Sequence, residues 1–182
     1  MRRIAARIAL FGGVIAVLGA GSYALAGGGS TNVKDELTGY EEVPALSTSG
    51  SGEFRARIDD QHREIHWTLS YAGLEGNVLQ SHIHLGNVSV AAGISTFLCT
   101  NLGNGPAGTQ ACPAPPATIS GTIRPADVIG PAGQGIAPGQ FEELVAAVRA
   151  GATYANVHSS LYPAGEIRAQ LDGRSDDHGD DD

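Results

Sequence analysis

The chain has 182 residues, of which 42 % are hydrophobic and 16 % charged, with a formal net charge of −8. This length predicts one domain with short appendages. The negative charge excludes nucleic acid and anionic membrane surfaces as expected partners, because both would repel the protein.

The N-terminus has the layout of an export signal. Three arginines within the first seven residues precede an apolar run over 8–18, and Ala24 and Ala26 are small residues of the kind that signal peptidases read. We expect residues 1–26 to be a cleaved signal peptide and the protein to be secreted or periplasmic. An uncleaved membrane anchor is the alternative, but about a dozen apolar residues fall short of the roughly 20 that a span needs. No second apolar run follows, so no membrane span is expected after cleavage.

After a predicted flexible leader over 27–32, the chain alternates between strand and turn patterns. The segment 37–44 contains Pro44, which cannot donate to a sheet ladder and therefore suits an edge or a strand end. Apolar and polar residues alternate over 54–58 and again over 64–71, which is typical of half-buried strands. The second of these runs holds Trp67, which we expect to anchor the core.

The two runs just described should form a hairpin, because the turn residues 59–62 separate them.

Further short strands are predicted over 94–99 and 118–123. Cys99 ends the first of these strands, and Cys112 lies in the Gly- and Pro-rich segment between them. In an oxidising compartment two such cysteines usually pair, so a disulfide is expected. Two thiolate metal ligands are the alternative, although zinc sites rich in cysteine normally cluster four ligands.

The strand over 78–85 carries the most informative pattern in the chain. His82 and His84 alternate with apolar residues, so both imidazoles should point to one face, about 7 Å apart along the strand. Two imidazoles so placed can close on one metal ion or one buried carboxylate. A third histidine, His158, follows on a later predicted strand.

The segment over 139–150 has the hydrophobic spacing of a helix instead of that of a strand. Apolar residues recur at helical spacing over 139–150, with acidic residues in the first turn and a basic residue in the last. Gly151 is the expected C-terminal cap. The chain then returns to two strands, over 154–158 and 166–171, that predict an antiparallel hairpin.

At least seven short strands and one short amphipathic helix predict an all-β fold. The expected architecture is an antiparallel β-sandwich with Ig-like or superoxide dismutase-like Greek-key connections. The sandwich should span residues 33–172. The last residues, 173–182, contain five acids and predict a disordered acidic tail.

Three segments together resemble the CHRD domain, a module named for chordin and found in many exported bacterial proteins. They are residues 37–44, His82 to Gly86, and residues 150–158 together with 165–168. The resemblance covers about 33–172 and implies a secreted, β-sandwich-like domain. In chordin the module belongs to a protein that binds bone morphogenetic proteins, but a shared fold does not transmit that role to a single-domain chain. One departure is Ser159, where the family pattern more often has threonine.

Two interpretations of the histidines follow from these patterns. In the first, His82, His84 and His158 bind zinc or copper, and Glu166 or Asn156 completes or supports the site. In the second, the histidines form a purely structural polar network.

That network would have His82 or His84 hydrogen-bonded to Glu166, and Arg168 paired with Glu41 or Glu42.

The function expected first is a non-enzymatic binding or structural module for an unknown extracellular or cell-surface ligand. A metal-binding protein or metal-dependent redox enzyme that uses the three histidines is the alternative. No nucleophile motif or phosphate-binding loop is present in the sequence.

Overall fold

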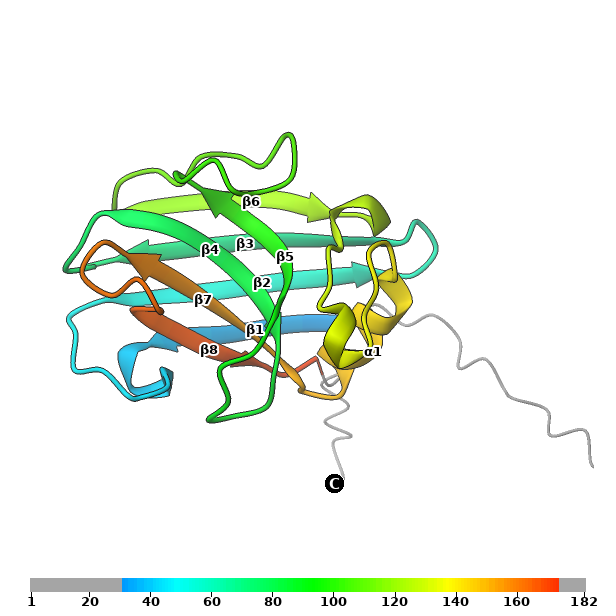
Figure 1. The fold of residues 1–182 in the computed structure, drawn as a ribbon, viewed down its shortest axis with the longest axis horizontal. Coiled ribbons are helices and arrows are strands. Elements are labelled where there is room, and N and C mark those ends of the chain that lie inside the picture. The colour runs from blue at the N-terminus through cyan, green and yellow to red at the C-terminus, as the bar shows by residue number, and fades with distance from the viewer. Residues whose placement is uncertain (1–30, 174–182) are drawn as a thin grey trace, which may run out of the picture.

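The computed structural model describes residues 31–173 (Figure 1). The predicted signal peptide and all but the first residue of the predicted acidic tail lie outside this range. No helix in the described range is long and apolar enough to cross a membrane. The elements are strands β1 (Thr31–Thr38), β2 (Ser51–Asp59), β3 (Glu64–Ala72), β4 (Val78–Leu85), β5 (Ile94–Thr100), β6 (Ala117–Ile123), β7 (Thr153–Ser159) and β8 (Ile167–Leu171), helix α1 (Phe141–Arg149), and three short 3-10 turns.

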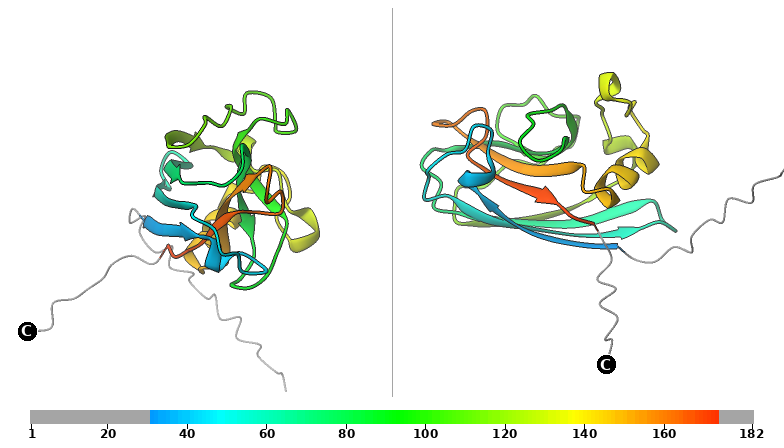
Figure 2. Two further views of the ribbon diagram at one scale, coloured as in Figure 1. Left: turned by 90° about the vertical axis from the view of Figure 1, so that its left-hand side faces the viewer. Right: turned by 90° about the horizontal axis from the view of Figure 1, so that it is seen from below.

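All eight strands belong to one antiparallel sheet with the order β5-β4-β7-β8-β1-β2-β3-β6. The joint between β8 and β1 is a single residue pair, Arg168 opposite Thr38. The sheet bends at this joint, so that its two halves face each other and enclose the core (Figures 1 and 2). The predicted all-β antiparallel class is therefore confirmed. The expected division into two separate sheets is not shown, because the hydrogen bonding is continuous and the sheet is nearly barrel-shaped.

The two edge strands, β5 and β6, are linked by the segment that runs between them. The side-chain amide of Gln110 donates to the carbonyl of Leu98 on β5 and to that of Ser120 on β6, at 3.2 Å in each case. The predicted disulfide is confirmed, since Cys99 on β5 is bonded to Cys112 in this segment. The Gln110 side chain thus bridges the two edge strands, and the disulfide fixes the connecting segment to β5.

Helix α1 covers one end of the near-barrel (Figure 1) and confirms the helix predicted over 139–150. Its core-facing side chains are Phe141, Leu144, Val145 and Val148, all buried. The helix ends as its sequence predicts. Gly151 adopts φ +64°, and the amides of residues 151 and 152 bond to the carbonyls of Val148 and Ala147 in a Schellman arrangement.

Strand β1 departs from the sequence-based expectation. It begins at Thr31, so the last two residues of the predicted leader are part of it, and it lies in the middle of the sheet between β8 and β2. Its inward positions include Val33 and Leu37 but also Asp35. The carboxylate of Asp35 interrupts the apolar residues whose alternation would identify a strand in the sequence. Partial burial raises the pKa of this carboxylate.

The strands β4, β7 and β8 are covered on both faces, which the alternating pattern does not predict. All seven residues of β7 are buried, and Arg168 on β8 is only 2 % exposed. The apolar residues of these strands face the core between the sheet halves. The opposite face is polar, and it is covered by three loops: 39–50 between β1 and β2, 86–93 between β4 and β5, and 160–166 between β7 and β8. We call it the histidine face.

Candidate metal centre

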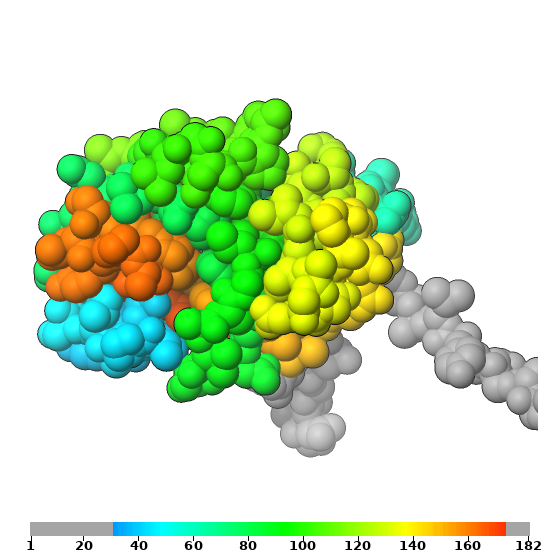
Figure 3. Space-filling model, viewed as in Figure 1, coloured from blue at the N-terminus to red at the C-terminus, as the bar shows by residue number. Residues whose placement is uncertain are grey.

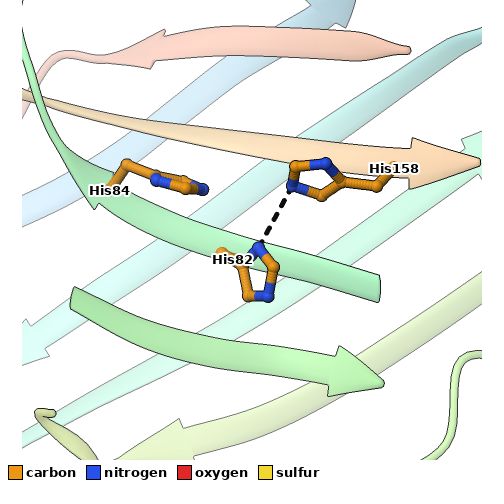
Figure 4. Close-up of side chains that lie close together, drawn as sticks. All are labelled: His82, His84 and His158. Atoms are coloured by element: carbon orange, nitrogen blue, oxygen red, sulfur yellow. Dashed lines mark hydrogen bonds between the residues drawn. The ribbon is translucent and has the colours of Figure 1, made fainter. Parts of the chain in front are cut away.

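The three predicted histidines converge on the histidine face (Figure 4). His82 and His84 lie two residues apart on β4, with Ile83 between them in the core. His158 lies on β7, which pairs with β4 in antiparallel register. One ring nitrogen from each histidine lies within 4.8 Å of the other two. The strand pairing therefore brings together residues that are 76 positions apart in the chain.

The closest approach joins Nδ1 of His82 to Nε2 of His158, at 3.1 Å (Figure 4). The His84 ring is also near, with its centroid 5.3 Å from that of His82 and 6.1 Å from that of His158. Four nitrogens placed tetrahedrally at 2.0–2.1 Å from zinc would be separated by about 3.3 Å. The His82–His158 pair already has that separation, so a small inward shift of His84 would complete a three-nitrogen site.

Two of the rings are oriented by backbone carbonyls, which can only accept hydrogen bonds. Nδ1 of His84 donates to the carbonyl of Ala92 at 2.8 Å, and Nδ1 of His158 donates to that of Pro163 at 3.1 Å. In the neutral rings, Nε2 then carries the lone pair: that of His84 has no partner among the described residues, and that of His158 accepts from the Nδ1–H of His82. This is the second-shell arrangement typical of metal-bound imidazoles, in which one nitrogen is tied back and the other faces the ion.

Burial keeps these histidines neutral. The solvent-exposed fraction is 0 % for His82 and 6 % for both His84 and His158. Desolvation, followed by repulsion from the neighbouring rings, lowers the pKa of His82 to about 2, and desolvation lowers that of His158 to about 4. The pKa of His84 is also lowered, mainly by burial. Neutral imidazole is the form that binds a metal, so protons compete weakly for this site.

Aromatic side chains wall the cluster, and the sequence interpretation did not assign them to it. Tyr154 stacks on His84 with ring centroids 4.7 Å apart, and Phe97 packs edge-on against His82 at 4.3 Å. Tyr154 could have been found, because it alternates in phase with Asn156 and His158 on the same strand. The carbonyls of Ala92 and Pro163 have no sequence signal, since any residue supplies a carbonyl.

A second layer of polar residues borders the histidines. The guanidinium of Arg168 lies 3.4 Å from the centre of the Tyr154 ring and donates to the carbonyls of Asn87 and Val90, which holds the 86–93 loop in place. Glu42, 8 % exposed, interacts electrostatically with Arg168, but the two form no ion pair within 4.0 Å in the described residues. Burial raises the pKa of Glu42 to about 7, against the influence of Arg168.

The other two predicted network acids lie away from the histidines. Glu166 forms no hydrogen bond with a histidine; its Oε1 accepts from the Thr48 hydroxyl at 2.8 Å and from the Glu75 amide at 2.7 Å. The hydrogen bond expected between a histidine and Glu166 is thus wrong. The reason is that Glu166 precedes β8, where the turn directs its side chain under the 39–50 loop. Glu41 accepts from the Gln170 amide at 3.0 Å.

Within residues 31–173, the potential metal ligands that converge are the three histidines alone. No cysteine, aspartate or glutamate of the described chain joins them. Both Nε2 of His82 and Nε2 of His84 are buried without a hydrogen-bond partner among the described residues. The chemistry that this arrangement offers is three neutral nitrogen donors with a position left open.

Comparison with known proteins places the chain in a family. The model of the CHRD domain matches residues 33–171, which is most of the chain and nearly the range over which the three sequence segments show the resemblance. Searches of the curated proteins and of the solved structures found no match. The matched range contains all eight strands except the first two residues of β1, as well as the three histidines. The chain therefore belongs to the CHRD domain family.

Proposed function

We propose that this protein is an exported, transition-metal-binding CHRD protein that holds zinc or copper through His82, His84 and His158. The observation that carries the proposal is the convergence of one nitrogen from each ring to within 4.8 Å in a buried site. Two of these rings are held by backbone carbonyls in the tautomer whose Nε2 carries the lone pair. The disulfide on the same strand as Phe97 is consistent with an oxidising compartment.

The donor set decides which metals the site suits. Imidazole nitrogens suit zinc, copper, iron and nickel, whereas calcium and magnesium require oxygen ligands. Among divalent ions, copper binds nitrogen sites more tightly than zinc does. Zinc and copper are therefore the expected occupants, and the ion that fills the site in the cell depends on supply as well as on affinity.

The test is metal binding by the purified, chelator-stripped protein. We expect one equivalent of zinc or copper by elemental analysis after dialysis, and a rise in melting temperature on addition of either metal. His84→Ala and His158→Ala should lose this binding. His66→Ala is the matched control, because His66 lies on the outer face of β3, bonded to the Thr122 hydroxyl. Absence of stoichiometric metal, together with an unchanged melting temperature, would overturn the proposal.

A protein-binding role is the second candidate, and a specific observation favours it. The exposed large hydrophobic residues include Tyr40, Val88, Val90 and Leu161, and each lies on one of the three loops over the histidine face. Apolar side chains gathered on neighbouring loops are typical of binding surfaces. A variant with serine at Tyr40, Val88 and Leu161 should keep its metal stoichiometry. If the binding role holds, the fraction of this variant retained at the cell surface should fall below that of the native protein.

A further inference from the structure

The candidate metal centre has an unmatched charge. A divalent ion held by three neutral imidazoles brings two positive charges to side chains that are at most 6 % exposed. Arg168, 2 % exposed, adds a third positive charge nearby, since it lies against Tyr154, which stacks on His84. Glu42 and Glu41 both interact electrostatically with Arg168 and offset its charge. The two positive charges of the ion itself would remain, because no carboxylate of the described residues joins the three histidines.

Buried charge of this size requires a counter-charge, because desolvation costs several kcal/mol per ion in a protein interior. The other buried glutamate of the described residues, Glu166, accepts through its Oε1 from Thr48 and Glu75 and does not join the histidines. No other carboxylate of the described residues joins the cluster. The protein thus supplies three of the four ligands of a tetrahedral ion and lacks the negative charge that would balance it. Structural zinc sites close with four protein ligands, whereas sites with three protein ligands leave the fourth to water or substrate.

Building on the proposed function, we infer that the fourth coordination position binds a small exogenous anion, with hydroxide from bound water as the simplest example. Asn156 is the neighbour placed to meet it. Its Cα is opposite that of His82 across the β4–β7 pair, and its side chain interacts with both His84 and Glu42. It is 2 % exposed, and its Oδ1 has no hydrogen-bond partner among the described residues, so this oxygen can accept from the O–H of a metal-bound hydroxide, while the amide NH₂ is the group that can donate to an anion without hydrogens.

The surface is hollowed over the histidine face. Figure 3 shows a depression where the 39–50, 86–93 and 160–166 loops meet, with reddish atoms of β8 at its floor. His84 and His158 keep a small exposed fraction, whereas His82 has none. An anion of two or three atoms would fit a narrow opening of this kind better than a large substrate.

The test uses cobalt(II) as a spectroscopic replacement for the ion and azide as the anion. Tetrahedral cobalt bound to the stripped protein should show an intense visible absorption, and azide should change that absorption saturably with a stoichiometry of one. Asn156→Asp should retain cobalt but bind azide more than about tenfold more weakly, because it supplies a fixed negative charge beside the ion. Asn104→Asp, at an exposed loop position, is the matched control and should respond as the native protein does.

The outcomes separate the two proposals. Stoichiometric cobalt whose spectrum is unchanged by excess azide would overturn the anion site and leave the metal site standing. Failure of cobalt, zinc and copper to bind would overturn both. An equal azide response in Asn156→Asp and in the native protein would remove Asn156 from the site. If Asn156→Asp does not fold, the azide titration of the native protein still decides whether the anion binds.

Discussion

Acidification of the metal-free protein should destabilise it, because the histidines of the candidate centre are buried in the neutral form. The folded-state pKa is lowered to about 2 for His82 and about 4 for His158, from 6.5 in an unperturbed chain. Below pH 6.5 the unfolded chain therefore binds more protons than the folded protein does. The stability from these groups is fully present above pH 6.5, and it is lost as the pH falls toward 4 for His158 and toward 2 for His82.

The size of the effect follows from these values. Between pH 7.5 and pH 5, each of the two histidines should reduce the free energy of unfolding by about 2 kcal/mol. Glu42 acts in the opposite direction: its pKa is raised to about 7, so its protonation over the same range restores about 2.5 kcal/mol. The net loss is about 1.5 kcal/mol, to which His84 adds in the same direction. The decline should be steepest at about pH 4.5, where Glu42 no longer compensates, and should ease below about pH 4, where His158 is protonated in both states.

Urea unfolding in the presence of a chelator measures this directly, since Trp67 is the only tryptophan in the chain and is 5 % exposed. The informative comparison is between the native protein and His82→Gln, which lacks one of the titrating groups. The loss between pH 7.5 and pH 5 should be about 2 kcal/mol smaller in the variant. An identical pH dependence in the two proteins would show that His82 is not a buried neutral group, and the reasoning would fail.

Three further substitutions test the fold around the site. Replacement of both cysteines by serine should cost about 3 kcal/mol, the chain-entropy value for a closed loop of this length, as measured by urea unfolding. Arg168→Met leaves two carbonyls of the 86–93 loop without their donor, at about 1–3 kcal/mol each, and should speed hydrogen exchange in that loop. Gly121→Val should cost about 1–3 kcal/mol and change the tryptophan fluorescence, because a Cβ there would lie 2.7 Å from the Trp67 indole.

The features that the sequence predicts well are those with local periodicity. The hairpin of β2 and β3 follows from strict alternation, and α1 follows from helical spacing with a glycine cap. The shared face of His82 and His84 follows from the period of two on one strand. The contact with His158 could only be proposed, because it depends on the pairing of β4 with β7 and thus on the order of strands in the sheet.

The features that escaped prediction depend on segments far apart in the chain. Alternation on β8 correctly places Arg168 opposite the apolar residues, but it equates that face with solvent. Burial of this face comes from the three loops, whose covering role has no periodic signature. The same limit explains the error over Glu166. Because Glu166 lies just before Arg168 in the sequence, it is predicted to lie near the histidines. In the structure the turn before β8 directs its side chain to Thr48.

The distribution of unsatisfied polar atoms argues that the histidine face binds a ligand. Eight buried side-chain nitrogen or oxygen atoms of the described chain have no hydrogen-bond partner within it, and four of them belong to His82, His84, Asn156 and Glu42. Each such atom costs about 1–3 kcal/mol unless something else meets it. A purely structural network would be expected to satisfy its own members, since a half-satisfied network is less stable than an apolar core. An ion at the three converging nitrogens would give a partner to Nε2 of His84, and a bound hydroxide would donate its O–H to Oδ1 of Asn156.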